Sequence, residues 1–210
     1  MAIQTFVAGN ILTAAQMNTL QQQAVMTFTT EAARATALPS PTEGMMAFLT
    51  APTVPAATGE YTKLPSGIFT VYDGSAWTCL TPVSAETTTS GTSSSATYTS
   101  SLTGGGTNPS VTVTTGTKAL VTISDWSGTP GTGGFIFAAT SVAVSGATTL
   151  AANDRWALNS GNGTASPSGF GATFMINGLT AGTNTFTMQY KSNSGTGSWS
   201  YRNLTVAGCL

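Results

Sequence analysis

The sequence predicts a mostly β protein with a short N-terminal α-helix, a small β-hairpin module and a C-terminal eight-stranded, jelly-roll-like β-sandwich. Three observations predict this class. Residues that favour strands are abundant, with 41 Thr among 210 residues. In the C-terminal half, apolar residues recur at every second position in short runs. Gly, Asn and Ser separate these runs, as expected for turns between antiparallel strands.

The chain is poor in charge and has no histidine. It contains six Lys+Arg and seven Asp+Glu, which is 6% of its residues and gives a net charge of −1. Without histidine it has no Ser-His-Asp triad, no Cys-His pair and no His-ligated zinc. Six scattered cations cannot neutralise a row of phosphates, so nucleic acid is not an expected partner. We expect no cofactor, and we expect Cys79 and Cys209 to be buried free thiols.

Residues 1–37 are expected to form an anchoring arm with a short helix over 13–26. Thr13 and Gln16 have capping-box spacing, and good helix formers follow them. A helix this short needs a partner, and the apolar residues before it have none nearby. Candidates for attachment to a particle are Phe6, Ile11, Leu12, Met17 and Leu20. Packing on the chain's own domain is the alternative. No secretory signal or membrane-spanning apolar run is visible.

Residues 38–83 are expected to form a small hairpin module. A proline-rich stretch stiffens its start. Asp73-Gly74 between two strand-like runs is a strong signal for a type I′ hairpin. The expected strands are 45–49, 67–72 and 75–80. Three short strands bury little, so the module is expected to lean on a neighbour.

Residues 84–96 are rich in Thr and Ser and almost free of apolar residues, which predicts a linker. Residues 97–210 have the length of one β-sandwich. Strands are expected at 96–99, 110–114, 118–124, 134–138 with 141–144, 155–158, 170–176, 183–191 and 199–206. About eight strands joined by short polar turns favour a jelly roll.

Segments throughout the chain carry recognisable patterns. They include FVAGNILTAAQMN (6–18), LPSPTEGM (38–45), VYDGSAW (71–77), 109–121, 144–149, 184–190 and 201–206. These segments resemble structural proteins of tailed bacteriophages, especially those of actinobacteria, of the minor tail, tail-fibre and head-fibre type. The resemblance covers most of the chain. It implies a non-enzymatic, surface-projecting virion protein, usually trimeric, without a cofactor.

A homotrimer is also expected from the residues themselves. A near-neutral chain with few charges dissolves poorly as a monomer. The consecutive apolar residues 135–137 place apolar side chains on both faces of one strand, and a symmetry mate would cover the outer face. The candidate interface residues are Phe135, Ile136, Phe137, Arg155 and Arg202. Because the chain is so poor in charge, we expect a defined partner for each cation of this domain, namely for Lys118, Arg155, Lys191 and Arg202. Arg155 and Arg202 are expected to form buried or interface pairs, with Asp125 and Asp154 as acceptors.

Aromatic residues near predicted strand ends suggest a glycan site, because the apolar face of a sugar stacks on an aromatic ring. The candidates are Trp126, Trp156, Trp199 and Tyr201. The alternative is that these rings fill the core or a subunit interface. Asp125 and Asp154 are the only carboxylates of this domain that could form a glycosidase pair. Asp154, beside Arg155, is better explained as a capping or ion-pairing residue.

Together these observations predict a virion structural protein. We expect its N-terminal end to bind tail, baseplate or capsid proteins and its trimeric sandwich to project outward, where host-surface glycans are a further partner. A capsid decoration or head-fibre protein without a receptor role is the first alternative. A tail-tip glycan-degrading enzyme is the second, and the missing histidine and missing paired carboxylates oppose it. Insertion into a membrane is not expected.

Overall fold

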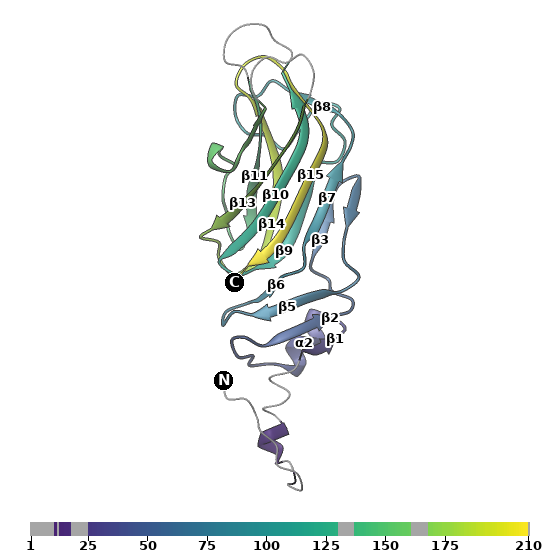
Figure 1. Cartoon of the computed structure of the whole chain (residues 1–210), viewed down its shortest axis with the longest axis vertical. Coiled ribbons are helices and arrows are strands. Elements are labelled where there is room, and N and C mark those ends of the chain that lie inside the picture. Colours follow the sequence, from purple (N-terminus) through teal and green to yellow (C-terminus); the bar gives the residue numbers. More distant parts are fainter. Residues whose placement is uncertain (1–10, 12, 18–24, 130–136, 161–167, 210) are drawn as a thin grey trace.

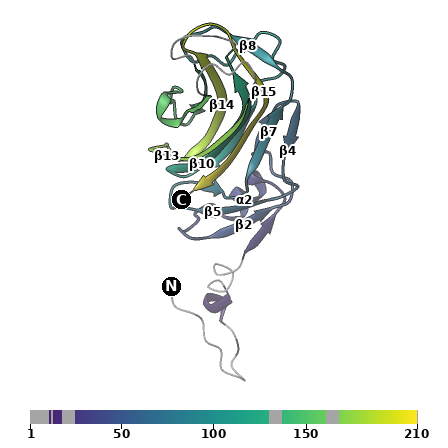
Figure 2. The same cartoon turned by 45° about the horizontal axis from the view of Figure 1, so that its top comes forward.

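The protein is mostly β, as the sequence predicts, and it is built from two stacked bodies (Figure 1). The computed structural model describes residues 11, 13–17, 25–129, 137–160 and 168–209. One body is a four-stranded sheet, and the other is a pair of larger sheets with six and five strands. Figures 1 and 2 show the four-stranded sheet crossing the end of the larger body at which the last strand finishes.

The four-stranded sheet has the order β1-β2-β5-β6. Its strands are β1 (Met26–Phe28), β2 (Met46–Leu49), β5 (Ile68–Tyr72) and β6 (Trp77–Cys79). The three strands expected in this module are confirmed. The fourth strand, β1, and the helix α2 (Glu31–Ala37) were not predicted. Because β1 is a strand of this sheet and α2 packs on it, the expected boundary between residues 37 and 38 cuts through a packed unit.

The hairpin turn differs from the predicted type I′ turn. Gly74 has a φ of 94°, whereas neither Asp73 nor Ser75 has a positive φ. The turn therefore needs only one left-handed residue, as in type II′. The Asp73 carboxylate accepts hydrogen bonds from the backbone N–H groups of Ser75 at 2.8 Å and Ala76 at 2.7 Å. These bonds hold the pKa of Asp73 below its usual value although partial burial raises it.

The predicted N-terminal helix is confirmed at its start, and residues 18–24 of its predicted range lie outside the described residues. Gln16 N donates to Thr13 Oγ1 at 3.2 Å and Thr13 N donates to Gln16 Oε1 at 2.9 Å, which is the expected capping box. Residues 14–17 are helical. The helix does not extend to residue 26, because Met26 pairs with Ala47 at the open edge of β2.

Helix α2 is fixed on the small sheet by Arg34. Thr30 caps the helix, and its Oγ1 accepts from Ala33 N at 3.2 Å. The Arg34 side chain is buried, and its Nη1 donates to Thr70 Oγ1 at 2.9 Å. Its guanidinium lies 4.3 Å from the centre of the Trp77 ring, within cation–π distance. Burial lowers the pKa of Arg34, and the nearby Glu31 opposes this shift.

The two larger sheets face each other as a sandwich (Figure 1). The six-stranded sheet has the order β13-β10-β15-β7-β4, and β8 also pairs with β15. The five-stranded sheet has the order β12-β11-β14-β9-β3. The bounds are β3 (Ala56–Thr58), β4 (Tyr61–Lys63), β7 (Val83–Thr87), β8 (Gly91–Ser93), β9 (Ser110–Thr115), β10 (Lys118–Gly128), β11 (Ala138–Gly146), β12 (Leu158–Ser160), β13 (Ser168–Asn177), β14 (Gly182–Ser192) and β15 (Gly197–Cys209), with a 3-10 helix η1 at Asp154–Trp156.

The linker predicted at 84–96 is not a linker. It contains most of β7 and all of β8, and both strands pair antiparallel with β15. In β7, the buried positions alternate over Val83, Ala85 and Thr87. Because Thr is a strand former and its hydroxyl can bond inside the fold, a low apolar content did not prevent pairing here. The sandwich also includes β3 and β4, which the sequence had placed in the hairpin module.

Most strands predicted for the sandwich are confirmed near their expected positions. Residues 96–99 are an exception, since only Thr99 forms a bridge, with Tyr190. The strand expected at 155–158 is instead η1 followed by β12. Residues 134–136 of another expected strand lie outside the described residues, and β11 starts at Ala138.

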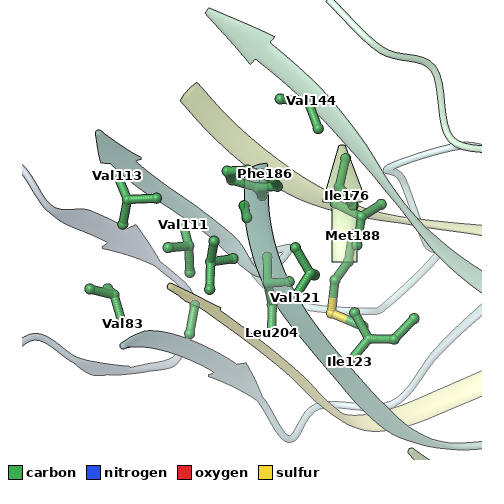
Figure 3. Packing of buried hydrophobic residues seen from close by; sticks show 14 of the residues in the cluster. Val83, Val111, Val113, Val121, Ile123, Val144, Ile176, Phe186, Met188 and Leu204 are labelled. Atoms are coloured by element: carbon green, nitrogen blue, oxygen red, sulfur yellow. The ribbon is translucent and has the colours of Figure 1, made fainter. Parts of the chain in front are cut away.

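A single hydrophobic core fills the space between the two sheets (Figure 3). Side chains from β10 and β15 on one sheet meet those from β9, β11 and β14 on the other. Figure 3 labels Val83, Val111, Val113, Val121, Ile123, Val144, Ile176, Phe186, Met188 and Leu204. These alternate residues point inward, as the period-2 pattern of the sequence predicts.

The small sheet contacts the sandwich through two glycines. A Cβ on Gly208 of β15 would lie 2.7 Å from Cys79 O and 2.8 Å from Thr114 O. A Cβ on Gly116 would lie 2.8 Å from Asp73 Oδ2 in the hairpin turn of the small sheet and 2.7 Å from the backbone O of Cys209. Both positions therefore require the small hydrogen of glycine to let the backbones approach. Both cysteines are free, but only Cys79 is buried, since Cys209 is half-buried.

Candidate functional site

A groove on the outer face of the five-stranded sheet is a candidate site. Its volume of about 450 Å³ is in the range of small-ligand sites. Strand β14 supplies the floor, and two irregular segments supply the walls. The lining residues are Ala96, Thr97, Tyr98, Ala151, Ala152, Asn153, Asp154, Gln189 and Lys191.

Backbone and hydroxyl hydrogen bonds hold the two walls in place. Thr99 and Tyr190 exchange backbone hydrogen bonds of 3.0 and 2.8 Å, which fix the first wall beside β14. Ser141 of β11 donates its hydroxyl to Asn153 O at 2.9 Å and to Trp156 O at 3.1 Å, which fixes the second wall. Since β14 alternates, Gln189 and Lys191 point outward between the walls while Tyr190 points into the core.

Asp154 is the charged centre of the groove. Lys191 Nζ lies 2.5 Å from Asp154 Oδ1, and Tyr98 Oη donates to the same oxygen at 2.8 Å. These two contacts hold the pKa of Asp154 below its usual value. Burial, followed by the bond to Asp154, raises the pKa of Tyr98. Lys191 Nζ also lies 4.8 Å from the centre of the Tyr98 ring, so it is held between Asp154 and Tyr98.

The structure pairs the charges differently from the sequence prediction. Asp154 was expected to accept from Arg155, but its partner is Lys191 of β14. Arg155 is exposed, with its guanidinium 5.7 Å from the centre of the Trp156 ring. The difference arises because η1 directs the two adjacent side chains apart. The expectation that Asp154 is an ion-pairing residue is confirmed.

Arg202 and Asp125 belong to a buried polar cluster inside the sandwich. Both side chains are 1% exposed. Arg202 donates to Tyr190 Oη at 3.3 Å, to Thr89 O at 3.1 Å and to Gly105 O. Burial raises the pKa of Asp125 to about 6, although a bond from Thr140 and the charge of Arg202 oppose the shift. Burial also raises the pKa of Tyr190.

The interface prediction is therefore corrected for Arg202. A side chain enclosed within its own sandwich cannot line a contact between subunits. Phe137 is half-buried, with its ring centre 5.7 Å from Lys191 Nζ. Phe135 and Ile136 lie outside the described residues.

The predicted glycan-binding aromatics separate into three environments. Trp199 has no exposed surface and packs 5.5 Å from Tyr190 in the core, so it is not available for stacking on a sugar. Trp156 is half-buried and packs against the core. Trp126 and Tyr201 are 53% and 54% exposed, and their ring centres lie 5.6 Å apart on the outer face of the six-stranded sheet.

A β-bulge places Tyr201 on this outer face. The register between β10 and β15 shifts beside Ser124 and Trp126. At the shift Tyr201 adopts a φ of 47°. The bulge interrupts the alternation of β15, so that Ser200 and Tyr201 both lie on the outer face while Trp199 and Arg202 on either side are buried. The exposed aromatic pair and the buried arginine therefore depend on the same backbone irregularity.

Two of the predicted attachment residues can be placed. Ile11 is 94% exposed and Met17 is 45% exposed. Phe6, Leu12 and Leu20 lie outside the described residues.

The two carboxylates proposed as a glycosidase pair, Asp125 and Asp154, lie in different places. Asp125 points into the core, whereas the Asp154 side chain is 64% exposed on the outer surface. They do not face one cleft, as a glycosidase pair would. Within the described residues, no group of three or more acidic or thiol side chains could hold a metal ion. In the same part of the chain, no helix is long and apolar enough to cross a membrane.

No protein-family model matches the sequence, and a comparison with curated proteins gives no significant match. The groove must therefore be interpreted from its own chemistry. Sequence reasoning singled out Asp154 and Lys191 but missed the roles of Tyr98 and Gln189. The alternation of β14, which places Gln189 on the outer face, was the only sequence signal for Gln189. For Tyr98 it was the presence of an aromatic residue near the start of the predicted sandwich.

Proposed function

We propose that the protein is a non-enzymatic structural component of a tailed bacteriophage virion, of the minor tail, tail-fibre or head-fibre type. Its N-terminal end attaches to other virion proteins, and its sandwich projects outward and binds glycans of the host surface. The observation that carries this proposal is the separation of the two ends. Residues 14–17 lie beyond the small sheet (Figure 1). The groove, in contrast, is lined by residues of the sandwich.

We infer that the sandwich is an eight-stranded jelly roll. Its support is the nested antiparallel pairing of β7 with β15, β9 with β14, β10 with β13, and β11 with β12. A long hairpin rolled into two facing sheets gives this pairing, as in jelly-roll domains. In this interpretation the first strand is β7, inside the segment expected to be a linker, and β3, β4 and β8 are additions at the edges.

A homotrimer is part of the same proposal. Its support is the outer face of the six-stranded sheet, which exposes large apolar side chains. They are Leu120, Trp126, Met175 and Tyr201. Leu120 and Met175 are direct partners on β10 and β13. Covering such a patch with a second copy removes apolar surface from water. Light scattering on the purified chain should give about three times the 21.2 kDa protomer mass, and a stable monomer would contradict it.

Truncation tests the attachment role. Tailed particles purified from cultures that express the full chain should contain it, as measured by mass spectrometry. A chain lacking residues 1–25 should fold but be absent from the particles. Retention of the truncated chain would contradict N-terminal attachment, and absence of the full chain would contradict the virion role.

A capsid decoration protein without a receptor role is the alternative within the same class. It shares the attachment end and differs in the groove, which would then have no ligand. Antibody labelling of particles separates the two positions, because a decoration protein would label the capsid surface and a fibre or tail protein would label the tail.

A further inference from the structure

We propose that the groove binds one uncharged sugar ring of a glycan, with Asp154 and Gln189 as its polar recognition groups. This inference rests on the proposed function, since a particle-surface protein meets cell-surface glycans. It moves the expected glycan site away from the predicted tryptophans. In the groove, Asp154 and Gln189 carry polar atoms that form no hydrogen bond within the described part of the chain.

Asp154 offers one free oxygen in a fixed orientation. Tyr98 and Lys191 both contact Oδ1, and Oδ2 has no hydrogen bond to the described part of the chain. The side chain is 64% exposed, so a ligand can reach that oxygen. Because the carboxylate is already oriented by two partners, a hydroxyl donor would bind it with little further loss of side-chain freedom.

Gln189 supplies both a donor and an acceptor beside this carboxylate. It is half-buried on the floor of the groove, and its amide makes no hydrogen bond with any described residue. A sugar hydroxyl can donate and accept at the same time, so neighbouring hydroxyls suit an amide next to a carboxylate. The methyl groups of Ala96 on one wall and of Ala151 and Ala152 on the other give apolar surface for the C–H groups of the ring.

The charge of the groove favours an uncharged ligand. Lys191 is 15% exposed and is already paired with Asp154, so it is not available for a ligand carboxylate or phosphate. An acidic sugar would instead approach the Asp154 carboxylate. Repulsion between like charges disfavours that approach.

Saturation-transfer NMR on the full chain tests this proposal. The probes are glucose, galactose, mannose and N-acetylglucosamine, with glucuronate and N-acetylneuraminate as acidic counterparts. We expect saturation transfer to at least one neutral sugar and less to its acidic counterparts. Asp154→Asn and Gln189→Ala should each weaken binding about tenfold, as for loss of one or two buried hydrogen bonds.

Thr187→Ala is the matched control, because Thr187 also points outward from β14 but does not line the groove. Its binding should be unchanged. The proposal is overturned if no neutral sugar receives saturation, if acidic sugars bind better, or if both groove variants bind normally. If Trp126→Ala loses sugar binding while Asp154→Asn and Gln189→Ala keep it, the site lies instead on the exposed pair of Trp126 and Tyr201.

The result is separable from the virion role. If the chain is found in particles but no sugar binds, the groove proposal fails and the virion proposal stands. If the groove binds sugars but the chain is absent from particles, the virion proposal fails.

Discussion

The sandwich and the small sheet are stabilised in different ways. The sandwich buries a large cluster of apolar side chains between two sheets, from Val83 to Val206. The buried cluster of the small sheet consists of Leu49, Ile68 and Cys79, with Phe28 packed against it. The small sheet therefore depends on other contacts, namely Arg34 under α2 and the glycine contacts with the sandwich. The comparison indicates that the sandwich is stabilised by its own core, whereas the small sheet depends on contacts outside its own cluster.

Phe186→Ala should have the largest effect on this comparison. Phe186 is fully buried in the sandwich core, so we expect a loss of about 4 kcal/mol in unfolding free energy. Urea unfolding should show both bodies lost together, because the small sheet depends on the sandwich. Thr187→Ala, which changes an outward-facing neighbour, should lie within about 0.5 kcal/mol of the original chain. A small sheet that stays folded at urea concentrations at which the sandwich is unfolded would contradict the dependence of the small sheet on the sandwich.

Asp125 should make the stability of the sandwich fall with rising pH. Its pKa is about 6 in the folded chain against an ordinary value of 3.8, so the folded state keeps this proton longer than the unfolded state. The contribution of Asp125 to the unfolding free energy is about 3 kcal/mol in total. It is fully present below about pH 4 and is lost as the pH rises through about 6.

Urea unfolding at pH 4, 5, 6 and 7 measures this slope. Asp125→Asn should remove it, whereas Asp154→Asn, a change on the surface, should leave it in place. An unchanged slope in Asp125→Asn would show that another group controls the pH dependence.

Gly208→Ala should separate the two bodies. The added Cβ would lie 2.7 Å from Cys79 O, so the backbones must move apart, at a cost of about 2 kcal/mol. Hydrogen exchange should accelerate in β5 and β6 more than in β10. Gly171→Ala is the control, because its Cβ would meet Ser124 Cβ at an ordinary 3.5 Å. Equal acceleration in both bodies would contradict a contact-specific effect.

Arg34→Ala should give the smallest change and affect only the small sheet. It removes the hydrogen bond to Thr70 and the stacking on Trp77, worth about 1–2 kcal/mol together. Hydrogen exchange should increase in α2 and β5, with the sandwich unchanged. Arg155→Ala, which removes an exposed arginine stacked on Trp156, should change neither body. Global destabilisation by Arg34→Ala would contradict the comparison.

The sequence made the regular parts of the sandwich predictable. Strands β9, β10 and β14 alternate apolar and polar residues so regularly that their inward faces could be assigned directly. The hairpin of β5 and β6 was predictable from Asp73-Gly74. Strands β7 and β8 were not, because their Thr and Ser side chains give the same composition as a linker. Only their pairing with β15 distinguishes them.

The groove could not be predicted as a unit. Tyr98, Asp154 and Lys191 come from three distant parts of the chain, and the sandwich topology brings them together. The low charge of the sequence did indicate that each cation has a defined partner. The assignment of Asp154 to Arg155 failed because adjacent residues can point to different neighbours, whereas cross-segment contacts depend on the fold.

A cryo-EM reconstruction of tailed particles that contain the protein tests the central claim most directly. The account predicts density for the sandwich on the outside of the particle, with the groove facing solvent and the N-terminal end in contact with another virion protein. Density with the groove buried against the particle, or with the N-terminal end projecting outward, would contradict it.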